Sequence, residues 1–382
     1  MTGRPAVCAT PDPAELDPDP PAEPPRHAAL LNVQALRALA AMIVIFVHLE
    51  PLAARAGLAP AAFEFGNAGV DIFFVISGFI MVYTTGRKPV GPIHFIGYRL
   101  RRVAPLYWTV TLAVFAVALA APHLLQGTRA DPRHLLASLG FLPYPRADGS
   151  YRPVVFVGWT LNYEMAFYVV FAVGLALRRR LLGIGLSLAI LTGAILWGWA
   201  TRPTEPLMVI YTQPMIAEFG LGMILGTLWP RLPTLEPRAG RAALMAVMLL
   251  ALAAIVFDAL VWPSAERALA FGLPAFALVA AALLLERAGW SLRWRWIRAL
   301  GDASYAIYLT HFFVTQTAAM AVQRLGLSGP LPMVLAGALA LGGAAAVGLA
   351  VHRLVEKPMD AALRRLFRSA SRPTAKPQAV TV

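Results

Sequence analysis

Residues 31–52 read LNVQALRALAAMIVIFVHLEPL, and this stretch decides what kind of fold the chain can adopt. It is long and apolar enough to cross a bilayer as one helix, yet it contains Arg37 and His48. Their separation is close to three helical turns, so both side chains lie on one stripe, roughly 16 Å apart along the axis. Ionisable groups at membrane depth are costly and typically mark a pathway or a reacting site.

The composition indicates an integral membrane protein. The chain has 382 residues, of which 58% are hydrophobic and only 14% are charged, whereas soluble domains are about one quarter charged. The net charge of +13 does not indicate nucleic-acid binding, because the basic residues form short clusters between apolar stretches. The single cysteine, Cys8, excludes a disulfide within the chain.

The distribution of apolar stretches predicts an all-α bundle of about ten transmembrane helices. If the N-terminus is cytoplasmic, the inner segments contain about three times as many basic residues as the outer ones, as the positive-inside rule expects. Both termini are therefore predicted to be cytoplasmic. The predicted spans are residues 31–52, 66–85, 103–121, 156–177, 181–200, 207–229, 242–262, 267–285, 301–322 and 331–353.

The pattern of apolar and polar stretches divides the chain into three regions. Residues 1–30 are rich in Pro, Asp, Glu and Ala and predict a disordered tail, because they offer no apolar core. Residues 31–358 form the predicted membrane domain, and residues 359–382 are expected to be a second polar tail.

Polar residues within the spans predict a polar central cavity. One such residue alone could be interhelical packing, but several on different helices would be prohibitive if they faced lipid. Ser304, Tyr308 and His311 follow one another at offsets of four and three, which places them on one helical face. The other members are His48, Asp71 and Glu164, all expected in the outer half of the membrane, together with Gln213 and Glu218.

Arg99 and Arg102 are expected at the inner end of the third span. Their positions satisfy the positive-inside rule by themselves, so they can be topology markers alone. They are also three residues apart and share a helical face, so two guanidinium groups could bind a polyanion such as a nucleotide pyrophosphate.

These motifs together resemble one known family. The blocks are Arg37 with His48; GVDIFFVISGF at 69–79; Arg99-x-x-Arg102 before Pro105; WTLxxExxFY at 159–168 with SYxxYLxH at 304–311; and EKP at 356–358. In this order they resemble the acyltransferase-3 family of multi-pass membrane acyltransferases, which O-acetylate polysaccharides, lipopolysaccharide and related acceptors. The chain ends soon after the last span, so no SGNH-type esterase domain is expected.

The resemblance implies a bacterial inner-membrane enzyme that moves an acyl group, by family expectation acetyl, from acyl-CoA to a glycan hydroxyl. It implies that His48 is catalytic and that Arg99 and Arg102 bind acyl-CoA. His48 would be either a general base or an acyl carrier. Asp71 is our first candidate to orient its ring.

The other candidate residues also have expected roles, and alternative functions remain open. Glu164 is the second candidate to orient His48, and Arg37 could stabilise the leaving thiolate or a phosphate. Ser304, Tyr308 and His311 would line the substrate cavity, and no metal site is predicted. A secondary transporter, a membrane sensor and an enzyme acylating a macrolide-like small molecule remain alternatives. The sequence does not specify the oligomeric state.

Overall fold

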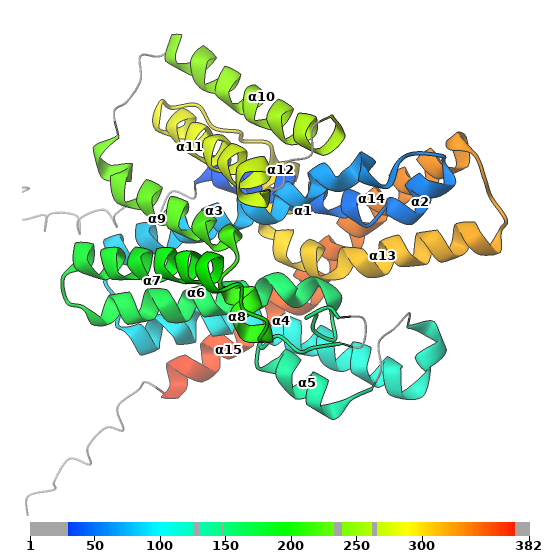
Figure 1. The fold of residues 1–382 in the computed structure, drawn as a ribbon, viewed down its shortest axis with the longest axis horizontal. Helices are drawn as coiled ribbons and strands as arrows, with labels where there is room; N and C mark the ends of the chain where they lie inside the picture. The colour runs from blue at the N-terminus through cyan, green and yellow to red at the C-terminus, as the bar shows by residue number, and fades with distance from the viewer. Residues whose placement is uncertain (1–29, 126–129, 147–148, 233–238, 262–265, 371–382) are drawn as a thin grey trace, which may run out of the picture. The chain divides into compact units, whose positions relative to one another are not determined.

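The computed structural model describes residues 30–125, 130–146, 149–232, 239–261 and 266–370. Every regular element within these residues is helical, which confirms the predicted all-α class (Figure 1). The helices before the middle of the chain are α1 (Leu31–Val47), α2 (Glu50–Arg55), α3 (Ala68–Arg87), α4 (Pro92–Ala120), α5 (Pro132–Leu139), α6 (Trp159–Ala176) and α7 (Arg180–Thr201). The later helices are α8 (Pro206–Tyr211), α9 (Ala217–Leu228), α10 (Ala239–Leu260), α11 (Leu273–Arg287), α12 (Arg295–Asp302), α13 (Ser304–Arg324), α14 (Pro330–Val351) and α15 (Lys357–Ala370).

Short 3-10 or π-helical turns precede or follow several of these helices. They are η1 (Pro60–Asn67), η2 (Pro122–Leu124), η3 (Phe156–Gly158), η4 (Pro214–Ile216), η5 (Trp229–Arg231), η6 (Ala268–Gly272) and η7 (His352–Glu356).

The protein is a multi-pass membrane protein. Within the described ranges, seven helical stretches are long and apolar enough to span a bilayer, and each overlaps one predicted span. They are Ala61–Arg87, Pro92–Ala120, Phe156–Ala176, Arg180–Thr201, Ala239–Leu260, Ala268–Arg287 and Pro330–Leu366.

The remaining three predicted spans differ from the expectation in specific ways. The stretch 31–52 is not one helix: α1 ends at Val47, and α2 begins just before Pro51, which cannot donate the backbone bond that would continue α1. The stretch 207–229 was wrongly predicted as continuous, because Pro214 separates α8 from α9. Helix α13 is continuous over 21 residues, but its hydroxyl side chains and the imidazole of His311 lower its hydropathy.

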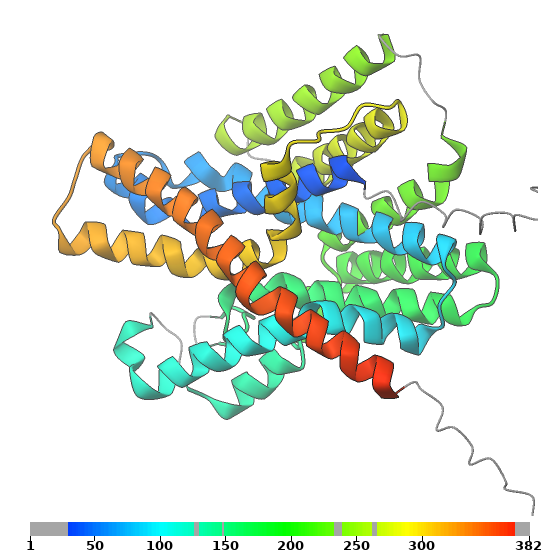
Figure 2. The same cartoon turned by 180° about the vertical axis from the view of Figure 1, so that it is seen from behind.

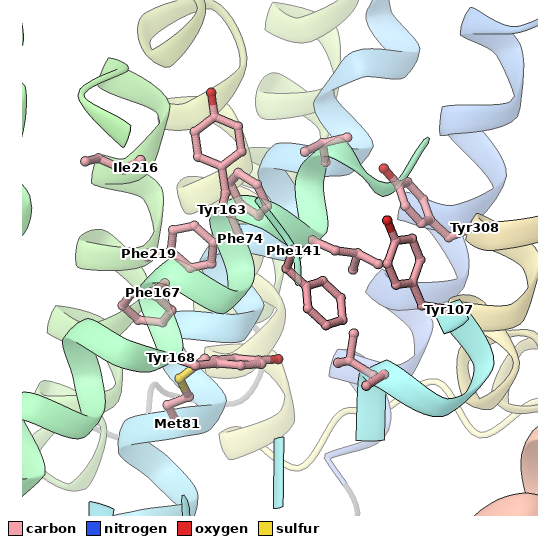
Figure 3. Packing of buried hydrophobic residues seen from close by; sticks show 14 of the residues in the cluster. Phe74, Met81, Tyr107, Phe141, Tyr163, Phe167, Tyr168, Ile216, Phe219 and Tyr308 are labelled. Atoms are coloured by element: carbon pink, nitrogen blue, oxygen red, sulfur yellow. The ribbon is translucent and has the colours of Figure 1, made fainter. Parts of the chain in front are cut away.

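Helix α1 contacts many other elements of the bundle. It packs against α3, α11, α12, α13 and α14, and Figures 1 and 2 show it between α3 and α13. An aromatic cluster joins α3, α6 and α9, with the Phe219 ring stacked between Phe74 and Phe167 at centroid distances of 4.3 Å on both sides (Figure 3). These buried rings hold the helices that surround the site at fixed positions.

Helices α3 and α9 pack backbone to backbone, and this contact requires glycine on both. A Cβ added to Gly78 would collide with the carbonyl oxygen of Phe219, and one added to Gly222 would collide with that of Val75. Small residues at such positions let transmembrane helices approach backbone to backbone. Gly78 belongs to the GVDIFFVISGF block, so part of that motif serves packing.

The predicted tails lie largely beyond the region that the structure describes. Residues 1–29 and 371–382 are outside it. Between the last span and the second of these segments, the π-turn η7 continues α14 into α15, so residues 357–370 are helical.

Candidate active site

A pocket of about 150 Å³ lies among α1, α3, α4, α6 and α13. Six of the nine candidate site residues line it. The other three, His48, Asp71 and His311, lie outside its lining. The six lining residues are Arg37, Arg99, Arg102, Glu164, Ser304 and Tyr308.

Arg37 faces the pocket from α1. Its Nε donates a hydrogen bond to Ser304 Oγ over 3.2 Å, which joins α1 to the first turn of α13. Both residues also line the pocket, so this contact brings together Arg37 and Ser304, which were predicted to lie in the site.

The two arginines of α4 are placed differently. The Arg99 guanidinium lies over the Phe95 and Tyr168 rings, at 5.3 and 5.7 Å from their centroids. Arg102 is half-exposed, and its Nη1 lies 3.3 Å from Glu356 Oε1. Both residues line the pocket, so a polyanion bound there could contact both guanidinium groups.

The Glu356 carboxylate that pairs with Arg102 also contacts a histidine. His352 Nδ1 lies 2.7 Å from Glu356 Oε2, so the Glu356 carboxylate connects an imidazole to a guanidinium. No role was predicted for His352, and Glu356 entered the prediction only as part of the EKP block. The pattern that could have linked Glu356 to Arg102 is the position of EKP after the last span, on the same predicted side of the membrane as Arg102.

Glu164 and Tyr308 have their own partners. Tyr168 and Ser77 both donate hydroxyl hydrogen bonds to Glu164 Oε1. Tyr308 donates to the carbonyl oxygen of Val157 over 2.9 Å, and its oxygen lies 2.8 Å from Thr160 Oγ1. These bonds tie α6 to α3 and α13 around the pocket.

His48 lies where α1 ends and meets His311 of α13. Their ring centroids are 5.0 Å apart, and the rings of Phe156 and Phe312 each lie 5.4 Å from the His48 ring. His311 is fully buried. Its Nδ1 lies 3.2 Å from the Ile307 carbonyl, which can only accept, so Nδ1 carries the proton.

The remaining nitrogen of His311 is therefore an acceptor in the neutral ring. This Nε2 has no hydrogen-bond partner among the described residues. The Tyr308 ring, which lines the pocket, lies 5.8 Å from the His311 ring. A continuous row of side chains thus leads from the arginine pocket through Tyr308 and His311 to His48.

Asp71 has a different partner from the one we expected. It is fully buried, and its Oδ2 forms a 2.7 Å ion pair with Arg267 Nη2. Within the described residues no hydrogen bond joins Asp71 to His48, so the structure gives no support to the predicted role of Asp71 in orienting that ring, and this role stays a prediction. Arg267, which directly precedes η6, was not recognised from sequence because it looked like an ordinary loop arginine.

Glu218 also lies near this ion pair rather than near His48. It is buried and neither of its carboxyl oxygens has a hydrogen-bond partner in the described part of the chain. A Cβ at Gly272 of η6 would approach Glu218 Oε1 to 2.9 Å, so the carboxyl packs directly on η6. Gln213, which lies between α8 and η4, instead donates to the carbonyl oxygen of Val209 in α8.

No group of three or more metal-ligating side chains occurs within the ranges the structure describes. The donor set around His48 is two imidazoles and aromatic rings, which does not supply a usual metal coordination sphere.

The fold and the pocket together define a multi-pass membrane protein with a cation-lined pocket beside a histidine pair. The chain belongs to the acyltransferase-3 family: the family model described as "Acyltransferase domain" matches residues 30–351. This confirms the resemblance, and the protein is a membrane acyltransferase.

Similar curated proteins come from several bacteria. The exopolysaccharide production protein ExoZ of Rhizobium meliloti is 40% identical over 78% of this chain and 90% of its own length. The acyltransferase MdmB of Streptomyces mycarofaciens is 27% identical over 88% of this chain and 92% of its own. The peptidoglycan O-acetyltransferase OatA of Listeria monocytogenes is 26% identical over 74% of this chain. This chain spans only 48% of OatA. No solved structure matches the chain.

Proposed function

We propose that this protein transfers an acyl group, acetyl in the first instance, from acyl-CoA to a hydroxyl of a cell-surface glycan. The observation that carries the proposal is the row of side chains from the arginine pocket to the histidine pair. Arg99 and Arg102 would bind the phosphates of CoA, because guanidinium groups suit polyanions. Arg37, deeper in the same pocket, would face the thioester end.

The donor is proposed to enter from the cytoplasm. The predicted orientation, with both termini on the cytoplasmic side of a bacterial inner membrane, agrees with two contacts between spans. Arg102 pairs with Glu356, and both are expected at the inner ends of their spans. Asp71 pairs with Arg267, both expected at outer ends.

The orientation of α1 and α13 gives further support. Arg37 contacts Ser304 and His48 contacts His311, so the two helices run in parallel. The predicted topology expects this, because both are odd-numbered spans. His48 would then lie towards the outer face, where a glycan hydroxyl can reach it.

His48 is the proposed reacting group. If His48 donates one ring proton to the partnerless His311 Nε2, its other nitrogen has a free lone pair. That lone pair can take the acceptor proton while the hydroxyl oxygen attacks the thioester carbon. The C–S bond breaks, and the proton passes to the leaving thiolate to give free CoA. Alternatively, the lone pair attacks the thioester carbon first, and the C–S bond breaks to release CoA and leave the acyl group on His48. The acceptor hydroxyl then attacks the acyl carbon, the N–C bond breaks, and the hydroxyl proton passes to the freed imidazole.

The proposal for the acceptor rests on relatives. ExoZ is named for exopolysaccharide production and OatA for peptidoglycan O-acetylation, so a polymeric sugar is proposed. MdmB is named only as an acyltransferase. Transfer to a small hydroxylated molecule and not to a glycan would replace the glycan as the proposed acceptor.

The test uses purified protein in liposomes with isotope-labelled acetyl-CoA supplied to one face. We expect wild type and His123→Ala, an exposed control histidine, to release CoA with an added acceptor, and His48→Ala to release none. Label bound to protein without acceptor identifies the acyl-carrier route. No CoA release with several donors and acceptors, together with CoA-independent substrate flux, would replace the enzyme proposal by transport.

A further inference from the structure

A second pocket lies on the opposite side of α1 from the arginine pocket. Its volume is about 370 Å³, and its walls come from α1, α10, α11, α12 and the segment before α12. Leu36 and Leu39 line it from α1, whereas Arg37 between them lines the arginine pocket. Helix α1 therefore forms one wall of each.

The second pocket offers almost no polar partner to an occupant. Its one polar lining side chain, Asn32, is already saturated by backbone groups. Asn32 Nδ2 donates to the carbonyl oxygens of Ala282 and Trp290, and its Oδ1 accepts from the Leu292 amide. The other lining residues are apolar, so an occupant gains mainly by burying hydrocarbon.

The rim of this pocket has the opposite character. Residues 290–298, WSLRWRWIR, combine three tryptophans with three arginines. Trp290 and Trp296 line the pocket and remain 39% and 57% exposed. Tryptophans at the edge of a span are typical of the membrane–water interface.

The arginines of the rim are available to a ligand. Arg293, Arg295 and Arg298 are all exposed. Arg295 and Arg298 are three residues apart on α12 and thus share a face. The segment contains no acidic residue, so the rim is a cationic surface directly beside an apolar cavity.

We propose that this pocket binds one anionic phospholipid of the bilayer, with an acyl chain between α1 and α11 and the phosphate headgroup on Arg295 and Arg298. The lipid matches the site in polarity and in charge. Its hydrocarbon chain fits an apolar cavity whose polar side chain already has its hydrogen bonds satisfied, and its negative headgroup fits the exposed guanidinium groups at the membrane–water interface. Such a lipid supports the face of α1 behind Arg37. The proposal does not depend on the acyl-transfer reaction.

The test measures lipid binding by the full-length protein in detergent. Dioleoyl-phosphatidylglycerol and dioleoyl-phosphatidylcholine are added separately, and bound lipid is counted by native mass spectrometry alongside the change in Tm. We expect the anionic lipid to bind on the order of tenfold more tightly. The double variant Arg295→Gln/Arg298→Gln is expected to lose that preference, while Arg178→Gln/Arg179→Gln, which alters two exposed arginines at another helix end, keeps it.

A cavity-filling variant tests the acyl-chain half. Ala35 lines the pocket, and Ala35→Phe is expected to abolish the retained lipid; Ala35→Met, a smaller change, serves if the Phe variant does not fold. Equal binding of both lipids, an anionic preference that survives Arg295→Gln/Arg298→Gln, or full retention in the filled variants would overturn the proposal and leave only a general lipid annulus.

Discussion

The ion pair between Asp71 and Arg267 makes a prediction that separates a structural role from a catalytic one. Asp71 is buried while the Arg267 side chain is 30% exposed, and Nη2 of Arg267 lies 2.7 Å from Asp71 Oδ2. The same guanidinium donates to the Asn67 carbonyl over 3.1 Å. The pair therefore fixes the start of α3 to the segment that leads into η6.

The expected cost of Asp71→Asn follows from this geometry. Removing one partner of a buried ion pair costs about 3–5 kcal/mol. Here water still solvates part of Arg267, and the amide oxygen of the introduced asparagine can accept from it, so we expect about 2 kcal/mol. A loss of that size lowers Tm by several degrees.

The assay is thermal unfolding of the detergent-solubilised protein, with acyl transfer measured per folded molecule. Asp71→Asn and Arg267→Gln should each lower Tm, and the double variant should lose less than the sum of the two, because both remove one interaction. Glu64→Gln, at an exposed carboxylate of η1, is the control and should leave Tm unchanged. An unchanged Tm with abolished turnover in Asp71→Asn would refute this reasoning and support the predicted role of Asp71 in orienting His48.

Three further predictions concern other parts of the molecule. Arg102→Gln should raise KM for acyl-CoA about tenfold with kcat little changed, measured by CoA release over a range of donor concentrations; an unchanged KM would leave Arg102 as a topology marker. Gly78→Val should lower thermal stability by about 1–3 kcal/mol or more, because its side chain meets the Phe219 carbonyl; a Tm equal to wild type would contradict the close α3–α9 packing. Burial lowers the pKa of His134 in α5, although its Nε2 donates to the Arg152 carbonyl; its contribution to stability is present above pH of about 6.5 and is lost as pH falls through the lowered pKa. The protection of the amides of residues 130–146 against hydrogen exchange, taken relative to the intrinsic exchange rate at each pH, should therefore fall at low pH in wild type, and His134→Gln should remove this pH dependence; equal pH dependence in both proteins would show that another group is responsible.

The sequence predicted the helical membrane fold and the approximate place of seven spans. It also predicted the family, because the ordered blocks around Arg37, His48 and Arg99 are visible without any structure. It failed at helix breaks. Pro51 and Pro214 interrupt apolar stretches that hydropathy alone reads as continuous, since hydropathy records side-chain polarity and not the backbone donor that proline lacks.

The site was only partly predictable for a similar reason. Helical periodicity places Ser304, Tyr308 and His311 on one face of a single helix, because that relation is local. It gives no information about which face of another helix lies opposite. Asp71 and His48 were expected at the same depth, yet depth does not specify the direction in which a side chain points.

The sequence by itself determined that the chain is an α-helical membrane acyltransferase with Arg37, His48, Arg99 and Arg102 in its family motifs. Only the tertiary structure decided the partners: Arg267 for Asp71, Glu356 for Arg102 and His311 for His48. The physical reason is that local periodicity follows from backbone geometry within one helix. Partners between helices depend on how distant segments pack, and at α3 and α9 that packing depends on glycines which permit contact between backbones.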